Sequence, residues 1–139
     1  MRSLRTIVAG RPPVTVTRTA TVVEAARQMK ERNVGSVVVV DGTRLVGIFT
    51  ERDALFRVLA AERDPSTTRL SEVMTREPQT LTPDEPFLRA LRVMHEGRFR
   101  HLPVVEQGRP IGIVSVRDAL DEDLAELRFD LEQREEMRE

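Results

Sequence analysis

The sequence predicts an α/β (α+β) protein made of two pseudo-symmetric β-α-β-β-α repeats packed sheet to sheet, followed by an acidic C-terminal helix. The first observation is an internal repeat: shifted by 65 residues, residues 13–56 align with 78–121 without a gap, and 16 of the 44 pairs are identical. The second is that short β-branched runs alternate with segments of helical spacing in each copy. One such unit is too small to bury a core alone, so two must share one.

The first strand of each copy is expected at residues 14–17 and 79–82, and an amphipathic helix follows it. Thr21 and Glu24 have capping-box spacing, and Pro86 suits a first helical turn. The apolar positions of the two helices recur at three- and four-residue steps: Val22, Ala25, Ala26 and Met29, then Phe87, Ala90, Leu91 and Met94.

A β-hairpin and a second helix complete each copy. The buried runs 36–40 and 101–105 lead through turns at Asp41-Gly42 and Gln107-Gly108 into strands at 44–49 and 109–114. The second helix is expected at 51–61 in the first copy and from Val116 into the tail in the second. These elements predict repeat 1 at 1–62, a linker at 63–69, repeat 2 at 70–124 and an acidic helical tail at 125–139.

Composition excludes several classes of protein. The 139 residues contain no cysteine and two histidines, which argues against disulfides, thiolate metal sites and cysteine nucleophiles, and we expect no bound metal. No apolar run is long enough to span a membrane, and the N-terminal residues lack a secretory pattern, so we expect a cytoplasmic protein without membrane contact. No nucleophile elbow, P-loop or histidine cluster is present, so an enzyme is not expected.

The net charge of −1 is unevenly distributed. Residues 121–139 carry nine acids and three arginines, so the tail has a charge of −6 and the rest of the chain +5. Lys30 is the only lysine, and the sequence has no Tyr or Trp. We therefore do not expect a nucleic acid as partner, since base-stacking side chains are scarce and the arginines form no stripe.

The same motif closes the hairpin of each copy. It reads Gly47-Ile48-Phe49-Thr50-Glu51-Arg52-Asp53 in the first and Gly112-Ile113-Val114-Ser115-Val116-Arg117-Asp118 in the second. A hydroxyl followed three residues later by an acid at a helix start is also the pattern of a capping box. The unpaired N–H groups of such a helix start favour phosphate as well.

These tandem motifs, together with the segments 77–84 and 100–105, resemble a pair of cystathionine β-synthase (CBS) domains, the Bateman module. The resemblance covers roughly residues 4–124. It implies a non-enzymatic regulatory module with two clefts between the copies for adenine-containing ligands: AMP, ADP or ATP, and in some members NAD or S-adenosylmethionine. It also implies a homodimer and a separate regulated protein.

The resemblance assigns site residues one by one. Asp53 and Asp118 would hold a ribose, with Thr50 and Ser115 beside it and Arg52 and Arg117 toward a phosphate. Base and phosphate contacts fall on Gly35, Ser36, Arg100 and His101, and adenine-flanking positions on Val14, Val34, Gln79 and Phe99. Because Gly35 leaves room for a planar base, we expect the cleft joining Asp118 to Gly35 to bind more tightly than the one joining Asp53 to Phe99.

Structural alternatives stay open at each position. The two acids can be caps, the arginines can lie in solvent, and the apolar strand ends can belong to the core. In the tail, leucines at 120, 124, 127 and 131 form a seam that either folds back on the chain or contacts a dimer partner. A ligand-free interaction or dimerisation scaffold is the alternative function.

Overall fold

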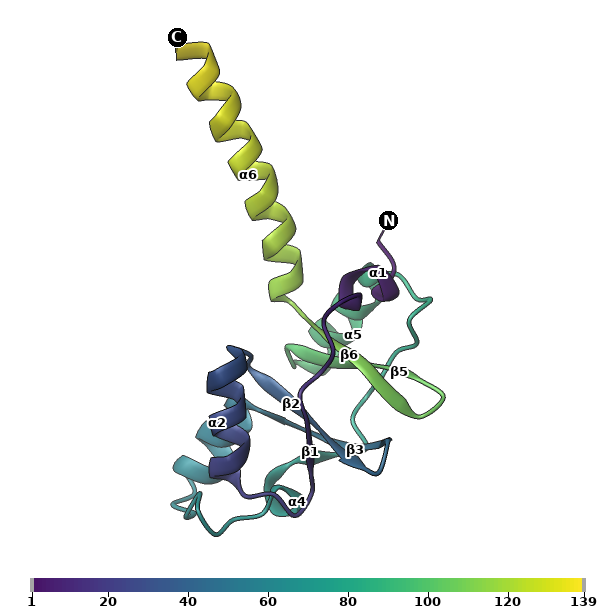
Figure 1. Ribbon diagram of the computed structural model, residues 1–139, viewed down its shortest axis with the longest axis vertical. Helices are drawn as coiled ribbons and strands as arrows, with labels where there is room; N and C mark the ends of the chain where they lie inside the picture. Colours follow the sequence, from purple (N-terminus) through teal and green to yellow (C-terminus); the bar gives the residue numbers. More distant parts are fainter. Residues whose placement is uncertain (1, 139) are drawn as a thin grey trace.

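The computed structural model describes residues 2–138, without the side chains of residues 120–126, 128 and 138. Two α/β units lie side by side, and one long helix, α6 (Arg117–Arg138), projects away from both (Figure 1). The α/β (α+β) class and the C-terminal helix are confirmed. Within residues 2–138, no helix is both long and apolar enough to cross a membrane.

The first unit contains a four-stranded sheet in the order β1-β2-β3-β4. Its strands are β1 (Thr15–Thr17), β2 (Ser36–Asp41), β3 (Arg44–Thr50) and β4 (Thr75–Arg76). β1 runs parallel to β2, and the other neighbours are antiparallel. The second unit contains the hairpin β5 (His101–Glu106) and β6 (Arg109–Ser115). The two sheets meet where β3 lies against β5 and β6, and the backbone N–H of Leu45 donates to the carbonyl of Gly108 at 3.0 Å.

The strand expected at residues 79–82 is reduced to a single bridge between Leu81 and Val104. In the first copy, the N–H of Val38 donates to the carbonyl of Val14 at 3.0 Å and extends the pairing of β1 with β2. Pro103 occupies the place of Val38 in the second copy and has no N–H to donate. The prediction of a matching strand at 79–82 was wrong, because Pro103 cannot donate the backbone hydrogen bond that Val38 donates in the first copy.

The first helix of each copy forms as predicted, as α2 (Val22–Arg32) and α5 (Phe87–Gly97). Thr21 and Glu24 make both hydrogen bonds of the capping box on α2, whereas Pro86 is the N-cap residue of α5. The second helix of the first copy differs from the prediction: a single turn, α3 (Glu51–Asp53), continues as the π-helix η1 (Ala54–Leu59).

Two short helices, one from each half of the chain, each pack in the core of the other copy. Leu4, Ile7 and Val8 of α1 (Leu4–Val8) are buried in the core of the second copy, with residues of α5, β5 and β6. Leu70 and Val73 of α4 (Leu70–Val73) are buried in the core of the first copy. The domain boundaries predicted from the sequence stay a prediction, but each core takes one helix from the other half of the chain.

The predicted linker, residues 63–69, is held against the first unit. The carbonyls of Pro65 and Thr68 accept hydrogen bonds from the N–H groups of Val23 and Val22 at 3.0 Å each. Thr68 is buried. Because these bonds satisfy the free N–H groups at the start of α2, the segment also serves as part of that helix's cap.

Candidate functional site

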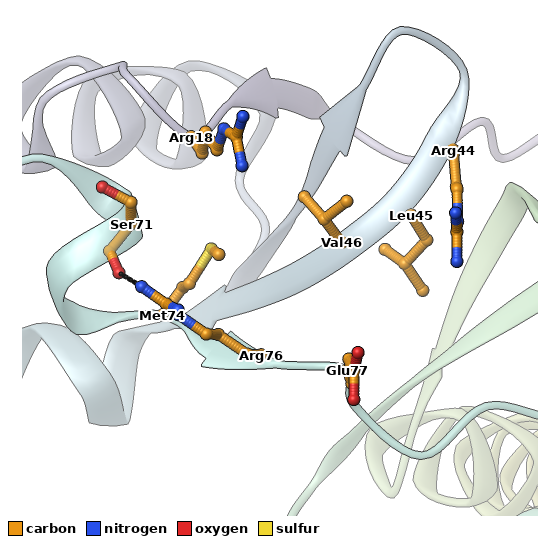
Figure 2. A pocket seen from close by; sticks show the side chains of 8 residues that line it. All are labelled: Arg18, Arg44, Leu45, Val46, Ser71, Met74, Arg76 and Glu77. Carbon is orange, nitrogen blue, oxygen red and sulfur yellow. Dashed lines mark hydrogen bonds between the residues drawn. The ribbon is translucent and has the colours of Figure 1, made fainter.

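A shallow cavity of about 400 Å³ lies over the start of β3, at the opposite end of that strand from Thr50. Figure 2 shows three arginines, Arg18, Arg44 and Arg76, around an apolar floor. Among the described residues, neither Arg18 nor Arg44 has an ion-pair partner. This cavity contains none of the site residues predicted from the sequence.

A second cavity, of about 610 Å³, lies between the first unit's α3 and the second unit's α5. Its lining includes three predicted residues: Arg52, Phe99 and Arg100. Met94, His95, Glu96 and Arg98 complete it. The structure therefore places a hollow where the resemblance predicts a cleft between the Asp53 motif and the Phe99 edge, although Asp53 itself does not line it.

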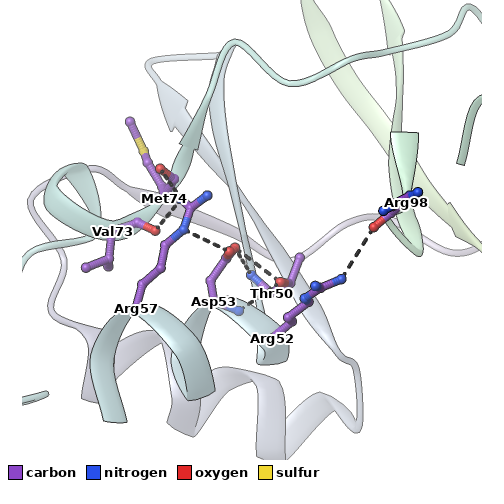
Figure 3. Close-up of polar contacts among 7 residues, drawn as sticks. All are labelled: Thr50, Arg52, Asp53, Arg57, Val73, Met74 and Arg98. Carbon is purple, nitrogen blue, oxygen red and sulfur yellow. Dashed lines mark hydrogen bonds and ion pairs between the residues drawn. The ribbon is translucent and has the colours of Figure 1, made fainter. Parts of the chain in front are cut away.

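Asp53 is the centre of a small polar network at the start of α3 (Figure 3). Its Oδ2 accepts hydrogen bonds from the Thr50 backbone N–H at 3.0 Å and from the Thr50 hydroxyl at 3.1 Å. The Asp53 N–H donates to that hydroxyl in return, at 3.2 Å, so the capping box is complete. The guanidinium of Arg57 lies 3.5 Å from Oδ1 and also donates to the carbonyls of Val73 and Met74. The capping interpretation of Thr50 and Asp53 is thus confirmed, and capping leaves lone pairs on Oδ1 for a further donor.

Arg52 reaches from the first unit to the second. Its Nη1 donates to the carbonyl of Arg98 at 3.4 Å, and its guanidinium stacks 5.0 Å from the centre of the Phe56 ring. Arg98 is the C-cap residue of α5 with a positive φ of 58°, and Figure 3 shows its carbonyl joined to the Arg52 guanidinium. Arg52 therefore places a positive charge at the mouth of the second cavity.

Asp118 holds the equivalent place in the second copy but has different partners. Its Oδ2 accepts from the Ser115 backbone N–H at 2.8 Å. Its Oδ1 forms an ion pair at 2.8 Å with Arg11, which lies in the connection between α1 and β1, and 6% of the Asp118 side chain is exposed. Arg11 also approaches the carbonyl of Ile113, at 3.4 Å. The sequence analysis missed Arg11, because nothing in the local pattern of residues 9–13 indicates a partner 107 positions away.

His101 lies in the middle of the molecule, where the two motifs approach each other. An ideal Cβ on Gly35 would lie 3.0 Å from Oε1 of Glu51 and 3.2 Å from Cε1 of His101. Burial is the largest influence on His101 and lowers the pKa of its imidazole below the ordinary value; Glu51, Asp118 and Asp53 oppose this, and Arg100 adds to it. The side chains of Glu51 and His101 thus lie against Gly35, so a base that enters there has to move them, and room for a base beside Gly35 stays a prediction.

The other predicted residues are spread along the strand ends. Ser36 is buried and pairs with Thr50, as His101 pairs with Ser115. Val14 packs against the first core, which favours its structural interpretation, while Val34 is exposed. Gln79 and Arg117 are exposed. The structure gathers Gly35, Ser36, Thr50, Asp53, His101, Ser115 and Asp118 around the meeting point of the two sheets, with Arg52, Phe99 and Arg100 in the neighbouring cavity.

Comparisons with known proteins agree with this geometry. The family model described as "CBS domain" matches residues 4–60 and 70–125. The CBS domain-containing protein CBSCBSPB2 of Arabidopsis thaliana is 37% identical over 121 residues, which cover 86% of this chain and 23% of that protein. The chain thus spans less than a quarter of the length of that relative.

Two solved structures are similar along most of their length. The CBS domain protein PAE2072 from Pyrobaculum aerophilum, complexed with AMP, has a TM-score of 0.76 and 28% identity, covering 84% of this chain and 89% of that one. The CBS domain pair of protein MJ0100, in complex with 5′-methylthioadenosine and S-adenosyl-L-methionine, has a TM-score of 0.80 and 27% identity, covering 91% and 98%. With both repeats matched and the paired architecture shared, this chain belongs to the CBS domain family and carries a pair of CBS domains.

Proposed function

We propose that this CBS pair is a non-enzymatic regulatory module that binds an adenine-containing ligand between its repeats. AMP, ADP and ATP are the first candidates, and NAD and S-adenosylmethionine the next. The observation that carries the proposal is the pair of fixed carboxylates, Asp53 and Asp118, at equivalent strand-to-helix turns. A carboxylate oxygen has two lone pairs, so a capped aspartate can still accept hydrogen bonds from ribose hydroxyls.

The surroundings supply the other parts of such a ligand site. Arg52 and Arg100 bring positive charge to the second cavity, and Phe99 gives it an apolar wall. Guanidinium groups suit phosphate oxygens, and a flat apolar wall suits an adenine ring. The AMP complex of PAE2072 and the adenosine-compound complexes of MJ0100 support this choice of ligand class.

A thermal-shift screen of AMP, ADP, ATP, NAD and S-adenosylmethionine tests the proposal. A ligand at 100 times its Kd stabilises the folded state by about 2.7 kcal/mol, so the melting temperature should rise by several degrees. Loss of charge-assisted hydrogen bonds to ribose in Asp53→Ala or Asp118→Ala should weaken binding at least about tenfold. Unchanged affinity in both folded variants would leave capping as the role of these acids.

The alternative is an interaction or dimerisation scaffold, and one observation favours it. Leu55, Phe56 and Leu59 of η1 are exposed, with Leu59 at 70%. A cluster of large apolar side chains on one helix is typical of a protein–protein interface. The homodimer and a separate regulated protein therefore remain part of the proposal, and a screen in which no ligand raises the melting temperature would favour the scaffold.

A further inference from the structure

The two carboxylates differ in how their charge is balanced. Asp118 is nearly inaccessible. Its Oδ1 forms an ion pair with Arg11 at 2.8 Å, and its Oδ2 accepts a hydrogen bond from the Ser115 N–H. Because only 6% of the Asp118 side chain is exposed and Arg11 lies against Oδ1, a ribose can reach this carboxylate only when the guanidinium moves aside. The Arg11 side chain is 49% exposed, so it has room to leave.

When a ribose displaces Arg11 from Asp118, Arg11 loses its only ion-pair partner among the described residues. The remaining contact is the Ile113 carbonyl at 3.4 Å, which carries no net charge. A ligand with its own anionic group can replace the carboxylate that Arg11 loses, since guanidinium pairs readily with phosphate. A neutral thioether on the same adenosine has no such group, and a cationic sulfonium repels the guanidinium unless its substituent carries an anion.

Arg57 makes a useful contrast in the other copy. It lies four residues beyond Asp53, on the adjoining π-helix η1, at the longer distance of 3.5 Å from Oδ1. Its Nη1 donates to the carbonyls of Val73 and Met74 at 3.0 and 3.1 Å. Those bonds hold the Arg57 guanidinium in place when Oδ1 of Asp53 binds another group. Ligand binding at Asp53 therefore does not require a cation to be displaced.

We propose that Arg11 makes the Asp118 cleft selective for adenosine phosphates over neutral or cationic adenosine compounds. This inference rests on the proposed function and concerns the specificity of that same site. Arg11 pairs with Asp118 when the cleft is empty and with the ligand's phosphate when a ribose occupies the carboxylate. The cleft at Asp53 lacks such an exchange and discriminates less between the two classes.

Isothermal titration calorimetry of the full chain with AMP and with 5′-methylthioadenosine tests the inference. The titrations use an Asp53→Asn background, in which the other cleft has lost the carboxylate proposed to bind ribose. We expect AMP to bind at least tenfold more tightly than 5′-methylthioadenosine in this background. Adding Arg11→Gln should bring the ratio of the two Kd values to within threefold, and adding Arg57→Gln in its place should leave the ratio unchanged.

A ratio that Arg11→Gln leaves unchanged, or an equal affinity for both ligands in the background, would overturn the inference while the proposed function stands. Failure of both ligands to bind the folded, unsubstituted protein would overturn the inference, and a thermal-shift screen in which none of its five ligands raises the melting temperature would overturn the proposed function as well. If Arg11→Gln fails to fold, Arg11→Lys keeps a positive charge beside Asp118. A folded Arg11→Lys variant should still prefer AMP, and a reversed preference would contradict the role of this charge.

Discussion

The hydroxyls of Thr50 and Ser115 stand at equivalent positions in the repeat but form different hydrogen bonds. The Thr50 hydroxyl accepts from the Asp53 N–H and donates to the Asp53 carboxylate. Among the described residues, no hydrogen bond involves the Ser115 hydroxyl, and Asp118 is reached through the Ser115 backbone N–H instead. One sequence motif thus gives a side-chain cap in the first copy and a backbone contact in the second.

We expect Thr50→Ala to lower the free energy of unfolding by about 1 kcal/mol, because it removes a helix N-cap. Ser115→Ala should change it by less than about 0.5 kcal/mol, since the backbone N–H that binds Asp118 remains. Urea unfolding of both variants without ligand measures the difference. Equal losses would mean that the Ser115 hydroxyl caps α6 in solution.

His101 should make stability depend on pH. Burial lowers the pKa of the folded-state imidazole below the ordinary value of 6.5, so the unfolded chain binds a proton more readily. The stabilising contribution is complete above about pH 6.5 and decreases as the pH falls from that value toward the folded-state pKa.

Melting temperatures recorded between about pH 8 and pH 5 should therefore fall less steeply for His101→Gln than for the parent. His95 is exposed on α5, and His95→Gln is the matched control. Parallel curves for the parent and His101→Gln would show that Glu51, Asp53 and Asp118 fully offset the effect of burial.

At the scale of elements, α1 and α4 pack closely on the glycines of β6 and β3. A Cβ at Gly112 would collide with Val8 of α1, whose branched Cβ cannot rotate away. A Cβ at Gly47 would lie 2.6 Å from the sulfur of Met74, just beyond α4. The methionine side chain is unbranched and can move aside.

Gly112→Ala should therefore destabilise the protein by roughly 1–3 kcal/mol, as overpacked core positions do, and Gly47→Ala by less than about 1 kcal/mol. Thermal denaturation of the two variants gives the comparison. Equal losses would mean that α1 can shift away from β6 as easily as Met74 can change its side-chain conformation.

The elements that the sequence predicts well are those whose signals are local. Thr21 and Glu24 define the start of α2, and Asp41-Gly42 defines the turn of the first hairpin. The strand at 79–82 was predicted by analogy with the first copy, and the analogy failed because the deciding residue, Pro103, lies on the partner strand. The π-helical geometry of η1 has no sequence signal that we can identify.

The candidate site was predictable in its motifs but not in its contacts. The acids at 53 and 118 were found from the repeat itself. Their partners Arg57 and Arg11 were not, since an ion pair between residues 11 and 118 depends on how α1 crosses to the second copy. The contacts of Glu51 and His101 beside Gly35 were not predicted either, because these side chains come from other elements.

For the whole molecule, the projecting helix α6 suggests how two copies associate. Leu127 and Leu131, on the same face, are 52% and 49% exposed, so these two leucines do not fold back on the body (Figure 1). The side chains at 120 and 124 lie outside the described residues. Contact with a second copy remains the prediction for this seam.

Sedimentation at micromolar concentration should give twice the monomer mass. Removing residues 121–139, or replacing Leu127 and Leu131 together by Gln, should weaken the dimer, because either change removes exposed apolar surface from the predicted contact. Glu132→Gln, on another face of the helix, is the control. A parent that sediments as a monomer would reject the dimer, and an unaffected dimer would exclude the seam from its interface.

The exchange of α1 and α4 between the cores has a thermodynamic consequence. If the second unit opens, Leu4 and Ile7 lose their burial, and the segment that leads into β1 loses its anchor; opening of the first unit releases Leu70 and Val73 in the same way. Neither repeat can therefore melt while the other stays intact, and calorimetry should record one cooperative transition whose van't Hoff enthalpy equals the calorimetric enthalpy. Two separate transitions would show that each repeat keeps its fold without the borrowed helix.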